Sequence, residues 1–128
     1  KERVLLTGDA VSSPIPYITP PPSRPMQSLR MLAQLDPEVI IPGHGPAFQD
    51  QTFLRLEASL LETVIDGVRR ALRDGMLTLD EVVAAVPAEG LRLAFTHDDP
   101  DLNARFRSRV RDLVRIAIRE ARDGQDYQ

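Results

Sequence analysis

Prolines are distributed unevenly along this chain of 128 residues, and that distribution limits where long helices can form. Nine of the eleven prolines lie within residues 1–46. Because proline lacks a backbone N–H and fixes φ, the interior of a helix excludes it. The later part of the chain is rich in Leu, Arg, Ala and Glu, which indicates helices. The sequence therefore predicts two regions, residues 1–50 with short elements and residues 51–128 with helices.

Two short apolar runs in the first region are predicted to be buried strands. Residues 4–7 and residues 39–41 are apolar, partly β-branched, and followed closely by glycine or proline. Between them lie the proline-rich residues 12–25 and a helix that is predicted to start near Pro25 and to end at Asp36. A strand, a connection with a helix and a second strand outline a crossover unit, so an α/β fold is expected. The predicted apolar face of this helix consists of Leu29, Leu32 and Leu35.

Three helices are predicted in the second region. Apolar residues recur at three- and four-residue spacing through residues 54–72, which is typical of an amphipathic helix. Residues 78–81 (TLDE) match a capping box and are expected to open a short helix to about Val86. Residues 88–99 are predicted to be a loop. A last helix with an apolar stripe is predicted to begin at Pro100.

Two positions in the first region carry side chains that could bind a metal ion. Asp9 stands in LLTGDAV, directly after a glycine at the end of the first predicted strand. His44 stands between two glycines in IIPGHGP, at the end of the second predicted strand, where an imidazole can offer one nitrogen to a metal. If the strands are neighbours in one sheet, both side chains emerge at the same edge, where binding sites of α/β proteins lie.

The segments LLTGDAV and SLRMLAQLDPEVIIPGHGP together resemble the C-terminal half of a metallo-β-lactamase superfamily domain, over residues 3–48. The resemblance implies an α/β fold, the C-terminal half of an αββα sandwich, followed by a helical tail. It also implies that Asp9 bridges two metal ions and that His44 binds the second. The implied parent is a metal-dependent hydrolase in which water activated by one or two ions of zinc, iron or manganese attacks a small-molecule ester, thioester, lactone or amide.

The chain lacks most of the ligands that this family uses. The family's histidine cluster lies upstream of the position of Asp9, and this chain has only two histidines. A zinc ion takes three or four protein ligands, so a chain that offers Asp9 and His44 is expected to bind zinc weakly or not at all. It is therefore expected to be an inactive C-terminal fragment. Half a sandwich exposes apolar strands, so its expected partner is the missing N-terminal half or a second copy.

Other residues suggest weaker alternatives. Tyr17, in the proline-rich loop, is a candidate for lining a substrate pocket. His97 and the acids that follow it are interpreted as a helix-capping loop. Seven arginines and three acids lie in residues 101–122, and the arginines are interpreted as a solvated face. The alternative function is a helical interaction or nucleic-acid-binding module formed by residues 54–122, with the outline of a helix-turn-helix arrangement.

Composition limits the location and the partners of the protein. A net charge of −3 provides no global attraction to nucleic acid or to an anionic membrane. The sequence has no cysteine, no secretory signal and no apolar run long enough to span a bilayer. We therefore expect a cytoplasmic protein without a membrane or nucleic-acid partner.

Overall fold

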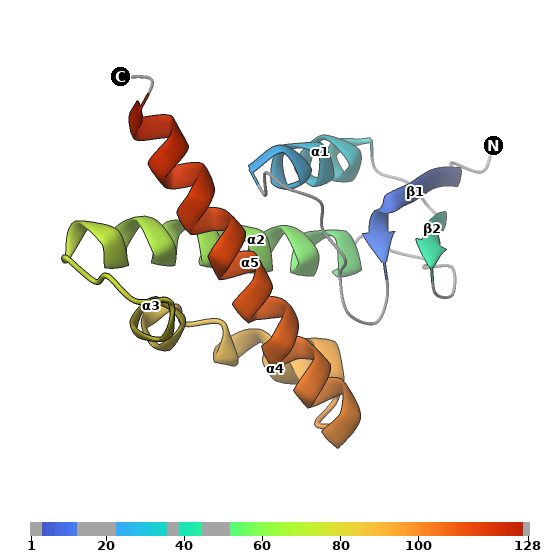
Figure 1. The fold of residues 1–128 in the computed structure, drawn as a ribbon. Helices are drawn as coiled ribbons and strands as arrows, with labels where there is room; N and C mark the ends of the chain where they lie inside the picture. The colour runs from blue at the N-terminus through green and yellow to red at the C-terminus, as the bar shows by residue number, and fades with distance from the viewer. Residues whose placement is uncertain (1–3, 13–22, 36–38, 45–51, 127–128) are drawn as a thin grey trace.

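The computed structural model describes residues 4–12, 23–35, 39–44 and 52–126 (Figure 1). In chain order the elements are β1 (Val4–Ser12), α1 (Ser23–Gln34), β2 (Val39–His44), α2 (Thr52–Arg73), α3 (Leu79–Ala85), α4 (Glu89–Thr96) and α5 (Pro100–Asp126). The hydrophobic core comes from the five helices and from the turn between α3 and α4.

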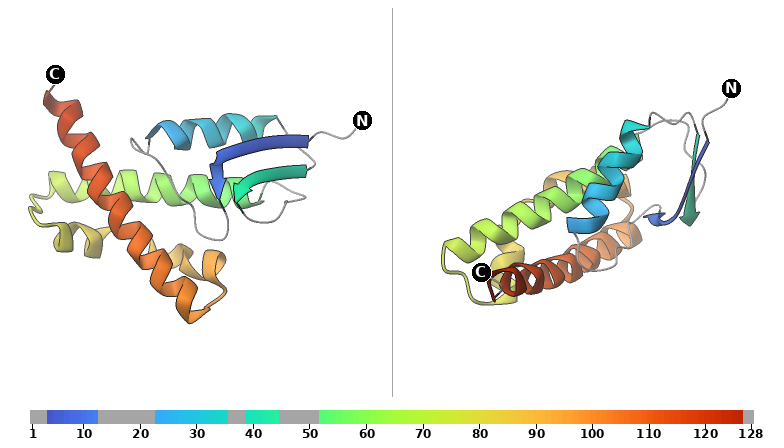
Figure 2. Two further views of the ribbon diagram at one scale, coloured as in Figure 1. Left: turned by 45° about the vertical axis from the view of Figure 1, so that its right-hand side comes forward. Right: turned by 90° about the horizontal axis from the view of Figure 1, so that it is seen from above.

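Helix α2 is central to the packing. It contacts α1, α3 and α5, while α3 and α4 each contact α5 as well. Figures 1 and 2 show α1 beside α2, and α5 crossing α2 at an angle. No helix within the described ranges is both long and apolar enough to cross a membrane. The buried apolar residues that form the core are Leu29, Leu54, Ala58, Leu60, Leu61, Val64, Val68, Ala71, Val82, Val86, Ala88, Phe95, Phe106, Val110, Leu113, Val114 and Ala117.

Local hydrogen bonds determine where α2 ends and α3 begins. Gly75 has a φ of 86°, a left-handed conformation that glycine adopts without the cost of a Cβ. The N–H of Met76 donates to the carbonyl of Ala71 at 3.1 Å, the long-range bond expected where such a glycine closes a helix. The hydroxyl of Thr78 then accepts from the N–H of Glu81 at 3.2 Å. The capping-box start that the sequence predicts for α3 is thus confirmed at Thr78.

Three aromatic rings connect α2, α4 and α5. The ring centroids of Phe53 and Phe95 lie 5.9 Å apart with planes at 83°, an edge-to-face arrangement. Phe95 also lies 5.5 Å from Phe106, with planes tilted by 33°. These separations fall in the range in which aromatic pairs add stability beyond the area that they bury. The short helix α4 is thereby fixed between the two long helices.

The two strands form a parallel pair at one end of the molecule. Val4 pairs with Val39, and Ser12 pairs with His44 at the other end of the pair, with register irregularities after Leu6. The connection between the strands contains α1, as a parallel pair requires. The residues predicted to be strands, 4–7 and 39–41, lie within β1 and β2.

The expected α/β fold class, half of an αββα sandwich, is wrong. The structure is predominantly helical, and the sheet within the described residues consists of β1 and β2 alone. Among the residues whose side chains the structure describes, the core lies in the helices and in the turn between α3 and α4. The physical reason is that the apolar stripes of α2 and α5 are long enough to bury one another, so the core forms between helices.

Two further expectations about single segments also fail. Residues 88–99 were predicted as a loop, but most of them form α4, because Leu91 and Phe95 are four residues apart and both face the core. Leu35 was placed on the buried face of a helix. It follows α1 and is 61% exposed, whereas Leu29 is buried.

The central position of Phe106 leads to a prediction about stability. Replacing it by alanine (Phe106→Ala) leaves a cavity between α2, α4 and α5, and we expect the free energy of unfolding to fall by about 3–5 kcal/mol. Chemical denaturation followed by far-ultraviolet circular dichroism measures this change. The control is Leu77→Ala, since Leu77 is 80% exposed and a change at such a site stays within about 0.5 kcal/mol. Equal effects of the two substitutions would contradict the assignment of the core.

Candidate functional site

The strand pair places Asp9 and His44 in the same, carboxyl-terminal half of the sheet. His44 is the last residue of β2, and its Cα is paired with that of Ser12, the last residue of β1. Asp9 lies in β1 between the two pairs formed by Gly8 with Pro42 and by Ser12 with His44. The strand therefore continues for three residues beyond Asp9, which was predicted from the sequence to stand at its end, and Asp9 lies in the carboxyl-terminal half of the pair rather than directly opposite His44.

A carboxylate and an imidazole are suitable donors for zinc, iron or manganese, but two donors do not make a complete metal centre. A catalytic zinc takes three protein ligands and a structural zinc takes four. Among the side chains that the structure describes, no group of three or more histidine, aspartate and glutamate residues is placed to hold a metal ion. Asp9 and His44 are two donors, one fewer than a catalytic zinc takes from a protein. Tyr17, the candidate for lining a pocket, lies outside the described residues.

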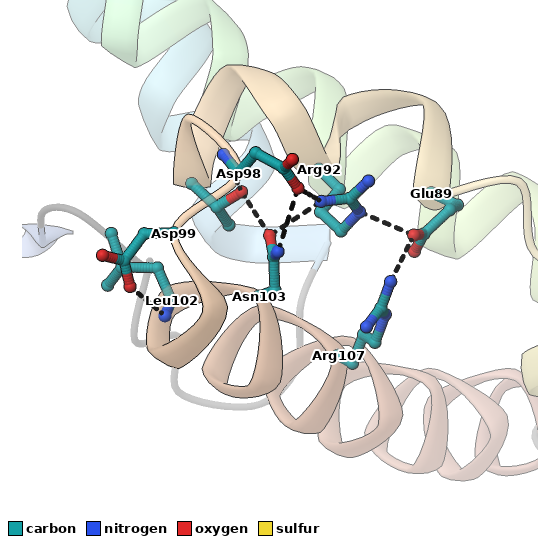
Figure 3. A network of polar contacts seen from close by, with 8 residues as sticks. Glu89, Arg92, Asp98, Asp99, Leu102, Asn103 and Arg107 are labelled. Carbon is teal, nitrogen blue, oxygen red and sulfur yellow. Dashed lines mark hydrogen bonds and ion pairs between the residues drawn. The ribbon is translucent and has the colours of Figure 1, made fainter.

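A network of charged and polar side chains connects α4 to α5 (Figure 3). The Nε of Arg92 donates to the Oε1 of Glu89 at 2.6 Å, and the Nη2 of Arg107 donates to the same oxygen at 2.9 Å. The Nη1 of Arg92 donates to the Oδ1 of Asp98 at 2.9 Å and to the Oδ1 of Asn103 at 2.8 Å. The amide nitrogen of Asn103 also donates to Asp98, at 3.1 Å. We call these five residues the corner network.

The corner network shifts the acid–base behaviour of three of its members. Hydrogen bonds from Arg107 and Arg92 hold the pKa of the Glu89 carboxyl below its ordinary value. The pKa of Asp98 is lowered by hydrogen bonds from Arg92 and Asn103. The same contacts with Asp98 and Glu89 raise the pKa of Arg92. These charges are satisfied within the chain, which is the pattern of a structural network rather than of a reactive site.

The turn that contains His97 is part of this corner. His97 and Asp98 have φ values of 50° and 64°, which is an uncommon conformation for residues other than glycine. A carboxylate oxygen of Asp99 accepts from the N–H of Leu102 at 3.0 Å. The hydroxyl of the buried Thr96 donates to Asn103 at 2.6 Å and accepts from the N–H of Asp98 at 3.2 Å. The helix-capping interpretation of this segment is confirmed at Asp99.

Sequence reasoning missed the corner network. The spacing of Glu89 and Arg92 on one helix turn was the single local signal for it. Asn103 lies eleven residues from Arg92, and Arg107 lies eighteen from Glu89. Such contacts depend on the angle between α4 and α5. The spacing of apolar residues along the sequence does not predict that angle.

Three arginines of α5 form ion pairs within the chain. Arg107 pairs with Glu89 of α4, and Arg111 pairs with Asp80 of α3 at 2.7 Å. Arg115 pairs with Asp112 on the same helix at 3.3 Å. All three arginine side chains remain substantially exposed, in accordance with the solvated face expected from the sequence. Two of these ion pairs also connect α5 to its neighbours.

Helices α3 and α4 have the spacing of a helix-turn-helix unit, because only residues 86–88 separate them. In such units the second helix contacts the nucleic acid. The structure describes α4 throughout, and Arg92 is its one basic residue. The Arg92 side chain is only 17% exposed and is bound by Glu89 and Asp98. This helix therefore offers no free cation to a phosphate, and no nucleic-acid function is assigned to it.

No protein-family model and no curated protein matches this chain. Any function must therefore be argued from the residues themselves, and two places stand out. The corner network is a structural feature of the helical part. The carboxyl-terminal half of the strand pair carries the two side-chain types that bind metal ions.

The corner network predicts how stability depends on pH. The pKa values of Glu89 and Asp98 are lowered in the folded chain. Ionisation of the two carboxyl groups therefore contributes to the free energy of unfolding at pH values above the ordinary carboxyl pKa. This contribution is lost as the pH falls below about 4, when the folded carboxylates become protonated. The double variant Glu89→Gln/Asp98→Asn should be less stable than the wild type at neutral pH and should approach it at acidic pH. Urea denaturation across this range tests the prediction.

A matched control for the pH experiment is Asp66→Asn, which changes an exposed acid of α2 outside the corner network. Its stability should follow that of the wild type across the same pH range. If the difference between the double variant and the wild type stays constant with pH, ionisation of Glu89 and Asp98 does not contribute to stability.

Proposed function

We propose that this chain is the C-terminal part of a metal-dependent hydrolase that resembles the metallo-β-lactamase superfamily, and that Asp9 and His44 are two of its metal ligands. The observation that supports the proposal is the parallel pairing of β1 with β2. It places both residues in the carboxyl-terminal half of one strand pair although they are 35 positions apart in the sequence. The carboxylate of an aspartate and the imidazole of a histidine are suitable donors for zinc, iron or manganese.

The elements around these residues support their proposed role. Parallel pairing fixes the separation and the direction of two backbone segments, so donors on them are held on a rigid scaffold. Gly8 precedes Asp9, and Gly43 precedes His44. Glycine has no Cβ, so it permits the backbone to approach a bound group closely. Both candidate ligands follow such a residue. Asp9 and His44 would therefore be two ligands held on paired backbone segments.

Asp9 and His44 would hold a metal ion that, when bound, would supply an activated water and a Lewis acid for hydrolysis. The role of this chain is to hold one side of the centre through a carboxylate and an imidazole. The substrate is a small molecule with an ester, thioester, lactone or amide bond. The remaining ligands come from a histidine-rich segment other than residues 1–128, since the second histidine of the chain, His97, belongs to the turn before α5. The 128-residue chain alone is inactive.

The partner of the chain follows from the same strand pair. Parallel sheets are covered on both faces, and their strands are near-continuous apolar runs such as VLL in β1 and VII in β2. Among the described elements, β1 and β2 pair only with each other, and α1 contacts β1. The proposed partner is the N-terminal half of the hydrolase, with a second copy of the chain as the substitute when that half is absent. We place the protein in the cytoplasm, because it has no cysteine.

The two histidines of the chain provide a direct test of the metal-ligand assignment. In an NMR titration of the 128-residue chain with zinc, we expect the imidazole signals of His44 to shift and those of His97 to stay in place. The shifts should saturate only at high zinc concentration, because two donors bind weakly. The substitution Asp9→Ala should weaken the response of His44, whereas His97→Ala should leave it unchanged. Equal shifts of both histidines would overturn the assignment.

The catalytic role is tested in the full-length protein that contains this chain. Losing a residue that only supports a metal ligand lowers activity by about 10–100-fold. Losing a ligand itself should have a larger effect, so we expect Asp9→Ala or His44→Ala to lower hydrolysis by at least about 100-fold. The control variant His97→Ala should retain activity. Metal-dependent hydrolysis by the 128-residue chain alone, or full activity in the Asp9→Ala variant, would contradict the proposal.

The need for a partner is tested by the oligomeric state. In sedimentation-velocity runs over a range of concentrations, we expect the 128-residue chain to self-associate, because a second copy would take the place of the proposed N-terminal half on the apolar strand pair. Replacing Ile40 by glutamate (Ile40→Glu) in β2 should shift the chain towards monomer, and Leu77→Glu on the α2–α3 turn is the control for added charge. A monomer at every concentration, with β2 protected from hydrogen exchange, would show that the strand pair needs no partner.

A further inference from the structure

We draw no further inference here: the strongest candidate, the exposed apolar patch that Met31 and Leu35 form at the C-terminal end of α1, carries nothing, because nothing in the structure shows what covers it.

Discussion

Burial of the apolar stripe of α2 is the interaction on which the rest of the structure depends. Ten of the 22 residues of this helix are buried, and they contact helices from both ends of the chain. Each buried leucine or valine side chain contributes roughly 1.5–3 kcal/mol by leaving water. Neither α3 nor α4 exceeds eight residues, and isolated helices of that length are unstable in water. They persist because α2 and α5 provide the surface on which they pack.

Periodicity predicted the long helices well because their burial follows from their own sequence. The stripe over residues 54–72 and the stripe that starts after Pro100 correspond to α2 and α5. Helix α4 was missed because Gly90 and the neighbouring Pro87 suggest a loop, while its stability comes from the contacts of Phe95 with Phe53 and Phe106. Those contacts join residues more than ten positions apart, so no local pattern reports them.

The predicted sandwich was wrong because it needs more strands than the described residues form. The placement of the candidate ligands depends only on the strand pair. The family resemblance covers residues 3–48, and within that range the described elements are one parallel strand pair and its crossover helix. A sandwich requires further strands, and the later residues supply helices instead. The placement of Asp9 and His44 needs only the direction and the register of β1 and β2. For this reason the site proposal does not depend on the incorrect sandwich.

Helix α1 connects the strand pair to the helical part, and the way it is attached determines how the proposed ligands are held. Leu29 is buried against the core that α2 and α5 share, whereas Arg30 pairs with Glu62 of α2 at the surface. Both side chains of that ion pair are about half exposed, so water and salt screen most of their attraction. Truncating a buried leucine costs about 2–5 kcal/mol, and an exposed ion pair contributes at most about 1 kcal/mol. Apolar packing at Leu29 therefore holds α1 on α2 more strongly than the ion pair does, and α1 in turn contacts β1, the strand that contains Asp9.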